Sequence, residues 1–349
     1  MRIVRTVVPF LLLAMCAAPM PGQDTPSYKS NPEFQKAYRE AMGMRGQNLS
    51  FAPDAYKKAN KIAGGQCMEC LQGMYAAQMQ IGEPKDAAAT AVLMAALAGT
   101  ALEKSRAQFR RAQALMAQAG DKPKPAQLDA AEGALKDSLD AYPRNTESLF
   151  LQGKVLAMMG KTDEAKAAFQ QCLECAPAGD PSRMRVEQFA ENPALSLAKR
   201  APAFTVNTLS GDKFQLDAMG GRVVLIDFWA TWCGPCNAAL PEMKKIAKDF
   251  AGRPLVIISV SWDSDEAKWK DFIEKKEMTW MQFRDADHRL SKAFDVNAIP
   301  HYFTIDSDGV LTAEMVGSDS DVEGKLRKLV AKAEAARAKQ AAAKTASSN

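Results

Sequence analysis

The stretch at residues 228–236, Phe-Trp-Ala-Thr-Trp-Cys-Gly-Pro-Cys, constrains this chain more than any other. Residues 223–226 before it are apolar, mostly β-branched, and follow a glycine pair, a pattern that predicts a buried strand of a parallel sheet. From residue 238 to residue 250 the apolar residues return at helical spacing. The sequence therefore places Cys233 and Cys236 where a strand ends and a helix begins.

This placement favours thiol chemistry. A helix N-terminus presents unpaired N–H groups and a partial positive charge, which stabilise the thiolate form of Cys233. Pro235 suits the first helical turn, where no backbone N–H is needed. Cys236, one turn further on, can resolve the mixed disulfide that Cys233 forms with a disulfide substrate. The alternative is half of a zinc site, but this region offers only His288 and His301 as further ligands, so we expect no metal.

The motif and its context resemble the active site of the thioredoxin superfamily, and the resemblance covers about residues 200–335. The Ala-Pro-Ala-Phe segment at 201–204 and the Ser-Gly-Asp turn at 210–212 are similar to the extracytoplasmic TlpA/ResA-type branch. The resemblance implies a thioredoxin-fold α/β sandwich with thiol–disulfide oxidoreductase activity and no cofactor. A peroxiredoxin does not fit, because the motif is a dithiol without the lone peroxidatic cysteine and threonine of that family.

The same resemblance points to two further site positions. Ile299 and Pro300 match the cis-proline loop, which would leave the Ile299 backbone free to pair with a substrate strand beside Cys233. The alternative is an ordinary proline at the start of a strand. Asp227 is a lone charge in an apolar strand, so we expect it to have a raised pKa. It matches the aspartate that assists proton transfer at the second cysteine of thioredoxin, and the resemblance implies the same role for Asp227 at Cys236. An aspartate that only bonds locally is the alternative.

The residues around the dithiol complete the predicted site. We expect the substrate to contact Trp232, Gly234, Pro235, Ile299 and Pro300. Many TlpA/ResA-type reductases have a glutamate three residues after the second cysteine, where this chain has Ala239, and the branch often lacks the strand aspartate. The proton-handling group therefore resembles that of thioredoxin, which argues against a specialised role in cytochrome c maturation. His301 could face the site or serve as a structural residue.

The N-terminus predicts export. Residues 1–23 contain Arg2 and Arg5, then an apolar run, then prolines, which is typical of a secretory signal peptide and short for a transmembrane span. We therefore expect a periplasmic or cell-envelope protein. Cys16 follows a poor lipoprotein box, and a lipid anchor there is kept as an alternative. The chain has 45 Lys+Arg against 41 Asp+Glu, which gives no argument for a nucleic-acid partner.

Residues 30–180 are alanine-rich, helical in periodicity and repetitive. The same pattern of residues begins four times, at Ala52, Ala87, Ala131 and Ala165. In each copy, similar residues follow the starting alanine four, seven and twelve positions later. These starts lie 35, 44 and 34 residues apart, and a longer loop at 120–125 explains the second step. The pattern resembles tetratricopeptide repeats, whose stacked hairpins leave a groove for a protein or peptide partner. A plain helical bundle is the alternative.

Once the signal is removed, the cysteines form three pairs, each spaced C-x-x-C: Cys67/Cys70, Cys172/Cys175 and Cys233/Cys236. An even set fits an oxidising compartment. Cys67 and Cys70 could form a local disulfide or a second redox pair, and Cys172 is expected to be a packed free thiol. About a hundred residues separate the first two pairs, which argues against a shared zinc site.

We therefore expect an α + α/β chain with two domains, a linker at 181–200, a thioredoxin-like domain at 201–336 and a flexible tail at 337–349. The Ala/Lys-rich residues 333–349 should extend the final helix and then fray. In the second domain we expect a hairpin at 203–216. Four further strands are expected at 223–229, 255–261, 280–283 and 302–305, and two helices at 235–250 and 265–276. We also expect a helical turn at 290–294, a hairpin turn at 306–309 and a last helix from 321 onward.

The expected function is an exported protein-disulfide reductase whose helical domain recruits partners. The Gly-Pro between the cysteines resembles thioredoxin, whose potential of about −270 mV favours disulfide reduction. The expected partners are disulfide-bearing exported proteins, a membrane thiol electron donor, and a protein or peptide held in the repeat groove. The alternative is a tetratricopeptide adaptor whose dithiol is a redox sensor.

Overall fold

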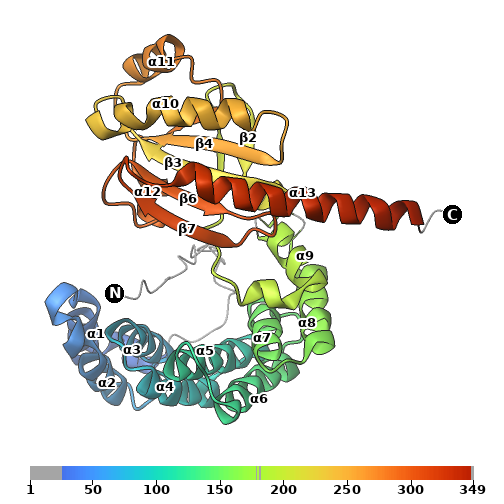
Figure 1. Ribbon diagram of the computed structural model, residues 1–349. Coiled ribbons are helices and arrows are strands. Elements are labelled where there is room, and N and C mark those ends of the chain that lie inside the picture. The colour runs from blue at the N-terminus through green and yellow to red at the C-terminus, as the bar shows by residue number, and fades with distance from the viewer. Residues whose placement is uncertain (1–25, 178, 181, 347–349) are drawn as a thin grey trace. The chain divides into compact units, whose positions relative to one another are not determined.

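The computed structural model describes residues 26–177, 179–180 and 182–346 (Figure 1). The predicted signal peptide at 1–23, with Cys16, lies outside these residues. The described residues divide into two compact units, with the boundary between Ala98 and Gly99. Within the described ranges, no helix is both long enough and apolar enough to cross a membrane.

The first unit consists of helices and 3-10 turns, and each α-helix contacts the next along the chain. Asn31 begins α1 by accepting hydrogen bonds from the backbone N–H groups of Glu33 and Phe34. Helix α3 ends at Gly82, whose φ of 83° lies in the left-handed region that glycine adopts without strain. The elements are η1 (Ser27–Ser30), α1 (Pro32–Gly43), η2 (Gly46–Phe51), α2 (Ala52–Ile62), α3 (Met68–Ile81) and α4 (Pro84–Leu97).

The second unit begins with five α-helices, and each again contacts the next. Thr100 and Glu103 form a reciprocal capping box at the start of α5, and Asn145 caps α7. The helices are α5 (Ala101–Ala119), α6 (Pro125–Ala141), α7 (Thr146–Met158), α8 (Thr162–Cys175) and α9 (Arg183–Glu191), followed by the turn η3 (Pro193–Ser196).

The helical region is consistent with the predicted repeats. The four repeat-start residues lie on α2, α4, α6 and α8, and each is at most 1% exposed; they are Ala52, Ala87, Ala131 and Ala165. A Cβ on Gly153 of α7 would lie 2.7 Å from the ring of Phe169 of α8. A Cβ on Gly73 of α3 would likewise collide with the ring of Tyr56 of α2. Both units thus use a glycine to let an aromatic ring from a neighbouring helix approach closely.

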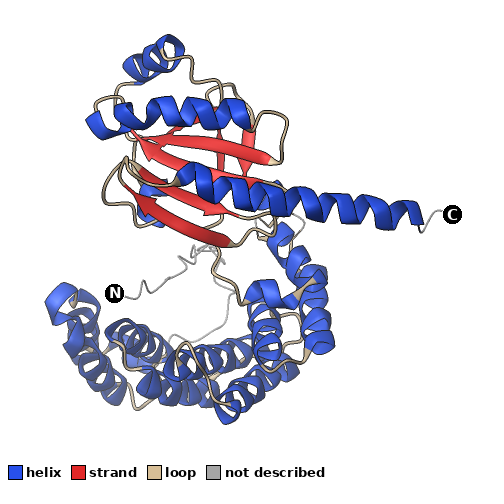
Figure 2. Ribbon diagram, viewed as in Figure 1, coloured by secondary structure: helices blue, strands red, loops and turns tan. Residues whose placement is uncertain are grey.

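A five-stranded sheet forms the rest of the second unit, in the order β5-β4-β3-β6-β7, beside a two-stranded hairpin of β1 and β2 (Figure 2). Central β3 runs parallel to β4 and antiparallel to β6. The strands are β1 (Thr205–Asn207), β2 (Lys213–Gln215), β3 (Val223–Trp229), β4 (Leu255–Ser261), β5 (Met281–Arg284), β6 (His301–Ile305) and β7 (Leu311–Val316). The turn and helices are η4 (Leu216–Met219), α10 (Gly234–Asp249), α11 (Glu266–Lys275), α12 (Arg289–Ala293) and α13 (Val322–Ala346).

Strand β3 is buried on both faces, as its apolar sequence predicts. Its alternate residues enter two cores. One face packs Val224, Ile226 and Phe228 against aromatic residues that include Phe214 and Phe294. The other face packs Val223 and Leu225 against α10 and α13, which lie across the sheet in Figure 1.

The predicted fold class is therefore confirmed: a helical N-terminal region is followed by a thioredoxin-fold α/β sheet domain. The strands and helices expected in the second domain lie within a few residues of observed ones, whereas β7, which follows the expected hairpin turn, was given no range from the sequence. The range 181–200, expected to be a linker, contains α9 and η3. Helix α13 continues to Ala346, well into the range 337–349 that we expected to form a tail.

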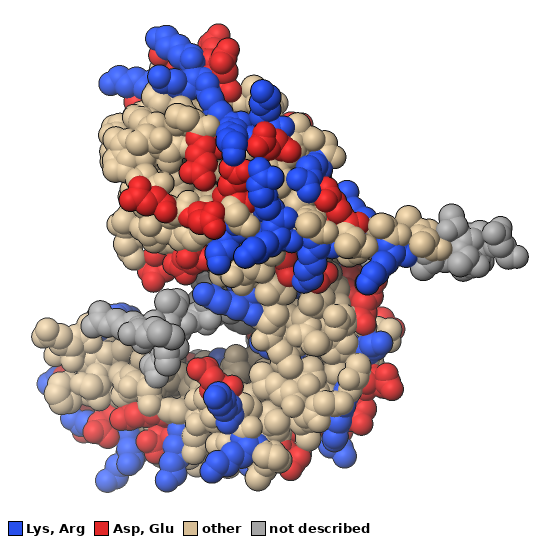
Figure 3. All heavy atoms as spheres, viewed as in Figure 1, with Lys and Arg blue, Asp and Glu red and all other residues tan. Residues whose placement is uncertain are grey.

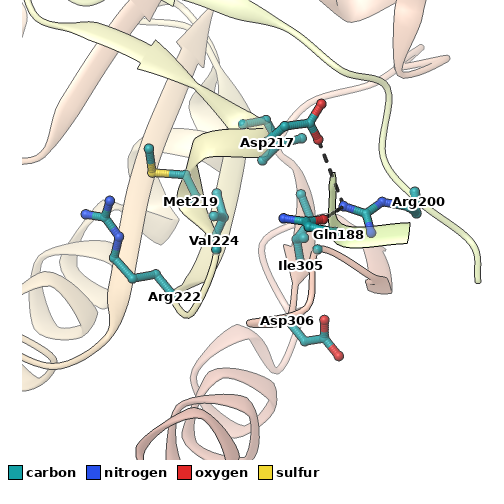
Figure 4. Close-up of a pocket in the computed structure, with 11 residues that line it drawn as sticks. Gln188, Arg200, Asp217, Met219, Arg222, Val224, Ile305 and Asp306 are labelled. Carbon is teal, nitrogen blue, oxygen red and sulfur yellow. Dashed lines mark hydrogen bonds and ion pairs between the residues drawn. The ribbon is translucent and has the colours of Figure 1, made fainter. Parts of the chain in front are cut away.

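Helix α9 is anchored to the sheet domain through buried ionic groups. The guanidinium of Arg185 donates two hydrogen bonds, of 3.0 and 2.7 Å, to one oxygen of Asp217, whose side chain is only 3% exposed. Arg200 donates to Gln188 of α9 and lies 4.0 Å from Asp217 (Figure 4). The pocket between these residues encloses about 10 Å³, room for one water molecule at most. It adjoins Val224, near the end of β3 remote from the cysteines.

Candidate active site

The two cysteines of the motif form a disulfide in this structure, at the start of α10. Cys233 is the N-cap residue, and its sulfur accepts a 3.1 Å hydrogen bond from the backbone N–H of Cys236. Pro235 occupies the first helical turn. The N-terminus of the helix therefore faces the sulfur of Cys233, and it would stabilise the thiolate that forms when the disulfide is reduced.

Apolar side chains cover the inner side of the disulfide. The cysteines are 5% and 7% exposed, and they pack in one cluster with residues that include Trp229, Trp269, Ile273 and Met278. On the outer side, Trp232 is 65% exposed and the space beside Gly234 is open. A disulfide of another molecule can therefore approach the pair from the side of Trp232 and Gly234.

The proline loop lies directly against the dithiol. The peptide bond between Ile299 and Pro300 is cis, as the resemblance implies. The carbonyl oxygen of Ile299 lies 3.8 Å from the sulfur of Cys233, although 66 positions separate the two residues in sequence. The carbonyl of Pro300 accepts a 2.9 Å hydrogen bond from the N–H of Gly317, just after β7. The end of the sheet thus brings the predicted substrate-contact residues together.

Asp227 is a buried carboxylate on the face of β3 that α10 covers. It is 4% exposed, and burial raises its pKa to about 7. A 2.8 Å hydrogen bond donated by the hydroxyl of Ser259 opposes this effect. Both protonation states are therefore populated near neutral pH, which is what a group that accepts and returns a proton requires.

His301 lies on the opposite face of the sheet from Asp227. Its ring stacks on Phe303 with 4.7 Å between the centroids, and its Nε2 lies 3.2 Å from a carboxylate oxygen of Glu314. Burial lowers its pKa, and the charge of Glu314 opposes this effect. In this structure His301 is therefore packed between β6 and β7 rather than directed at the cysteines.

Three residues with clear roles in the site were not identified from the sequence. Asp263 binds the backbone and the hydroxyl of Thr231, two residues before Cys233, at 2.9 and 2.6 Å. Ser259 binds Asp227, and the indole of Trp280 binds Ser259 at 2.8 Å. A usable signal was present, because polar residues alternate along the inward side of an otherwise apolar strand at 255–261 and continue to residue 263.

The other four cysteines of the described residues lie in the helical region. Cys67 and Cys70 form a second disulfide, at the start of α3, and both are 0% exposed. Cys172 and Cys175 are free thiols, and burial raises the pKa of Cys172 to about 11, in keeping with the expected packed thiol. Among the described residues, no group of three or more His, Cys, Asp or Glu side chains is arranged to hold a metal ion.

Comparison with protein families matches residues 197–314 to the AhpC/TSA family. The thiol-disulfide oxidoreductase ResA of Bacillus cereus (strain ZK / E33L) is 29% identical over 143 residues, which are 40% of this chain and 83% of ResA. The thioredoxin-like protein YneN of Bacillus subtilis (strain 168) is 32% identical over 123 residues, 34% of this chain and 71% of YneN.

A comparison with solved structures also matches part of the chain. The thioredoxin domain of a thiol-disulfide oxidoreductase from Bacteroides vulgatus is 29% identical. The match covers 38% of this chain and 96% of that domain, with a TM-score of 0.35.

Proposed function

Through its C-terminal domain the chain belongs to the thioredoxin-like family, and from this premise we propose that it reduces disulfides in other exported proteins. One observation carries the proposal. The dithiol of Cys233 and Cys236 lies at a helix N-terminus, against the loop of Pro300 and on the same side of the sheet as the buried carboxyl of Asp227. Each group has a task in thiol–disulfide exchange.

In the reduced enzyme the thiolate of Cys233 attacks one sulfur of a substrate disulfide. A mixed disulfide forms, and the other substrate sulfur leaves as a thiolate and takes up a proton. The thiolate of Cys236 then attacks the sulfur of Cys233, forming the Cys233–Cys236 disulfide and releasing the second substrate thiol. Two electrons pass to the substrate, and no cofactor takes part. In this step Asp227 accepts the proton of the Cys236 thiol, because a carboxyl with a pKa of about 7 can accept a proton near neutral pH.

The surface beside the dithiol suits a polypeptide substrate. Trp232 is 65% and Val316 57% exposed, and Val316 pairs in register with the residue that follows Pro300. Figure 3 shows few charged side chains over the end of the sheet where β3 ends and α10 begins. An extended substrate segment there would pair with the backbone of Ile299 and cover the indole of Trp232.

The proposal also covers the direction of the reaction, the source of its electrons and the role of the helical region. The Gly-Pro pair between the cysteines favours reduction, so an exported enzyme needs a membrane thiol protein to return it to the dithiol form. The repeat spacing and the buried repeat-start residues support tetratricopeptide-like hairpins that recruit a protein or peptide partner. The sequence pattern at 1–23 supports export to the periplasm or cell envelope.

The first test is reduction of insulin disulfides by the full chain with dithiothreitol. We expect turnover that Cys233→Ser abolishes, because the attacking thiol is lost. Cys175→Ser is the matched control, since Cys175 is a free thiol of the helical region, and it should leave the rate unchanged. Turnover that survives Cys233→Ser would rule out the assigned nucleophile.

The second test identifies the substrate. Cys236→Ser leaves Cys233 able to attack but unable to release its partner, so mixed disulfides should accumulate in the envelope fraction. Deleting residues 26–98, the first helical unit, should change or reduce the trapped set while small disulfides are still reduced. An identical set would show that this unit does not select partners. If the full-length Cys236→Ser variant forms no mixed disulfides, the adaptor function is favoured instead.

A further inference from the structure

A chain of three side chains leads from the edge of the sheet domain to the buried carboxyl. The indole Nε1 of Trp280 donates a 2.8 Å hydrogen bond to the hydroxyl of Ser259. That hydroxyl donates a 2.8 Å hydrogen bond to Oδ2 of Asp227. Ser259 lies directly opposite Asp227 in the parallel pair of β4 and β3, and Trp280 immediately precedes β5, the next strand. The sheet register therefore aligns the three groups.

The donor and the acceptor of each hydrogen bond in this series follow from the chemistry of the three groups. An indole N–H can only donate, so it occupies an acceptor position of the Ser259 oxygen. The hydroxyl hydrogen of Ser259 is then free to point at Asp227. A carboxylate accepts such a hydrogen bond more strongly than a neutral carboxylic acid does, because the bond to the charged form is charge-assisted.

Other groups that face Asp227 do not replace this interaction. On β6, Tyr302 lies opposite Asp227, and burial and the charges of Asp227 and Glu242 raise the pKa of its phenol, so it stays neutral. On this face α10 carries Glu242, whose charge acts on Tyr302, and both α10 and α13 contribute apolar side chains. The hydroxyl of Ser259 is the group whose hydrogen bond opposes the effect of burial on Asp227.

We propose that Ser259 and Trp280 are positioning residues for the second step of the reaction, and that they orient the carboxyl of Asp227 and favour its proton-accepting form. The inference rests on the proposed role of Asp227 at Cys236. Burial alone would keep Asp227 protonated at neutral pH, and a protonated carboxyl cannot take a proton from Cys236. The hydrogen bond from Ser259, supported by Trp280, counters this tendency.

The test separates resolution from attack. Stopped-flow traces of the reduced full chain with a peptide disulfide give the rate of each step as a function of pH. Ser259→Ala should move the midpoint of the resolution step up by roughly one pH unit, and slow it about tenfold below pH 7, with the attack rate unchanged. Trp280→Phe should give a smaller shift in the same direction, and Ser259→Thr, which keeps the hydroxyl, should restore the parent profile.

Ser291→Ala is the matched control. Ser291 is a buried serine of the same domain whose hydroxyl accepts a 2.6 Å hydrogen bond from the indole of Trp262 and donates a 2.7 Å hydrogen bond to Asp285. Its replacement should leave the midpoint in place. The midpoint of Asp227 itself can be followed by the ¹³C shift of its carboxyl in the oxidised full chain, where neither cysteine of the pair titrates.

Two outcomes would overturn the inference, and they can be told apart. If Asp227→Asn removes the pH dependence of resolution but Ser259→Ala and Trp280→Phe leave the midpoint of the parent, the positioning role is wrong and the role of Asp227 stands. If Asp227→Asn leaves the resolution step unchanged, the proposed role of Asp227 fails, and the inference fails with it.

Discussion

The carboxylate of Asp263 accepts two hydrogen bonds from Thr231, a 2.9 Å bond from the backbone N–H and a 2.6 Å bond from the hydroxyl. Asp263 lies two residues after β4, and Thr231 lies two residues before Cys233. The hydroxyl of Ser261 donates a further 2.6 Å hydrogen bond to the same carboxylate. The loop that carries the nucleophile is therefore tied to the neighbouring strand.

Asp263→Ala should loosen this loop. The replacement leaves the buried hydroxyl of Ser261 and two donors of Thr231 without their acceptor, which costs about 2 kcal/mol. We expect a lower unfolding free energy of the sheet domain and slower attack by Cys233, measured by urea denaturation and stopped flow. Asp271→Ala is the control, because Asp271 is an exposed residue of α11 that pairs with Lys275. Equal effects of the two substitutions would contradict the role of Asp263.

Asp227→Asn should remove a pH dependence of stability. The pKa of Asp227 is raised from 3.8 to about 7 in the folded chain, so the unfolded carboxyl ionises at lower pH than the folded one. Its contribution to stability is therefore fully present below about pH 4, falls as the pH rises to about 7 and then levels off. The total change is on the order of 4 kcal/mol.

Denaturation followed by tryptophan fluorescence measures this effect, because all five tryptophans lie between residues 229 and 280. The parent should lose stability between pH 4 and 7, and Asp227→Asn should lose less and be the more stable of the two above pH 7. Parallel stability profiles would show that Asp227 does not hold a raised pKa.

Arg185→Ala should destabilise the sheet domain although Arg185 lies in α9. It leaves the carboxylate of Asp217, 3% exposed, without its closest cation, which costs about 3 kcal/mol. Glu187→Ala on the same helix is the control, because Glu187 is exposed, pairs with Arg183 at the surface and should cost less than about 1 kcal/mol. Tryptophan fluorescence again reports the transition, and equal costs would mean that α9 is not anchored through Asp217.

The two disulfides should differ in reactivity. Both sulfurs of the Cys67–Cys70 pair are 0% exposed, whereas Cys233 and Cys236 adjoin the exposed indole of Trp232. Treatment with dithiothreitol and an alkylating agent should label Cys233 and Cys236 before Cys67 and Cys70, as measured by peptide mass spectrometry. Replacing Cys67 and Cys70 together by serine should cost about 2 kcal/mol, since the pair closes a short loop. Labelling of Cys67 as fast as Cys233 in the folded chain would contradict this order.

The sequence by itself determined the elements and the dithiol. An apolar β-branched run followed by helical spacing is a local pattern, so it located the junction that holds Cys233 and Cys236. The same kind of local pattern located the helices that bury Ala131 and Ala165. The cis bond before Pro300 followed from a family motif of a few residues.

The tertiary structure decided which side chains serve that dithiol. Thr231 and Asp263 are 32 positions apart, Ser259 and Trp280 are 21 apart, and Arg185 and Asp217 are 32 apart. Local propensity cannot pair such residues, because their contacts depend on the register of β3 with β4 and on where α9 packs. The chemistry of the cysteines therefore depends on one short segment of sequence. The positions of the side chains that support them depend on strands and helices that only the folded chain brings together.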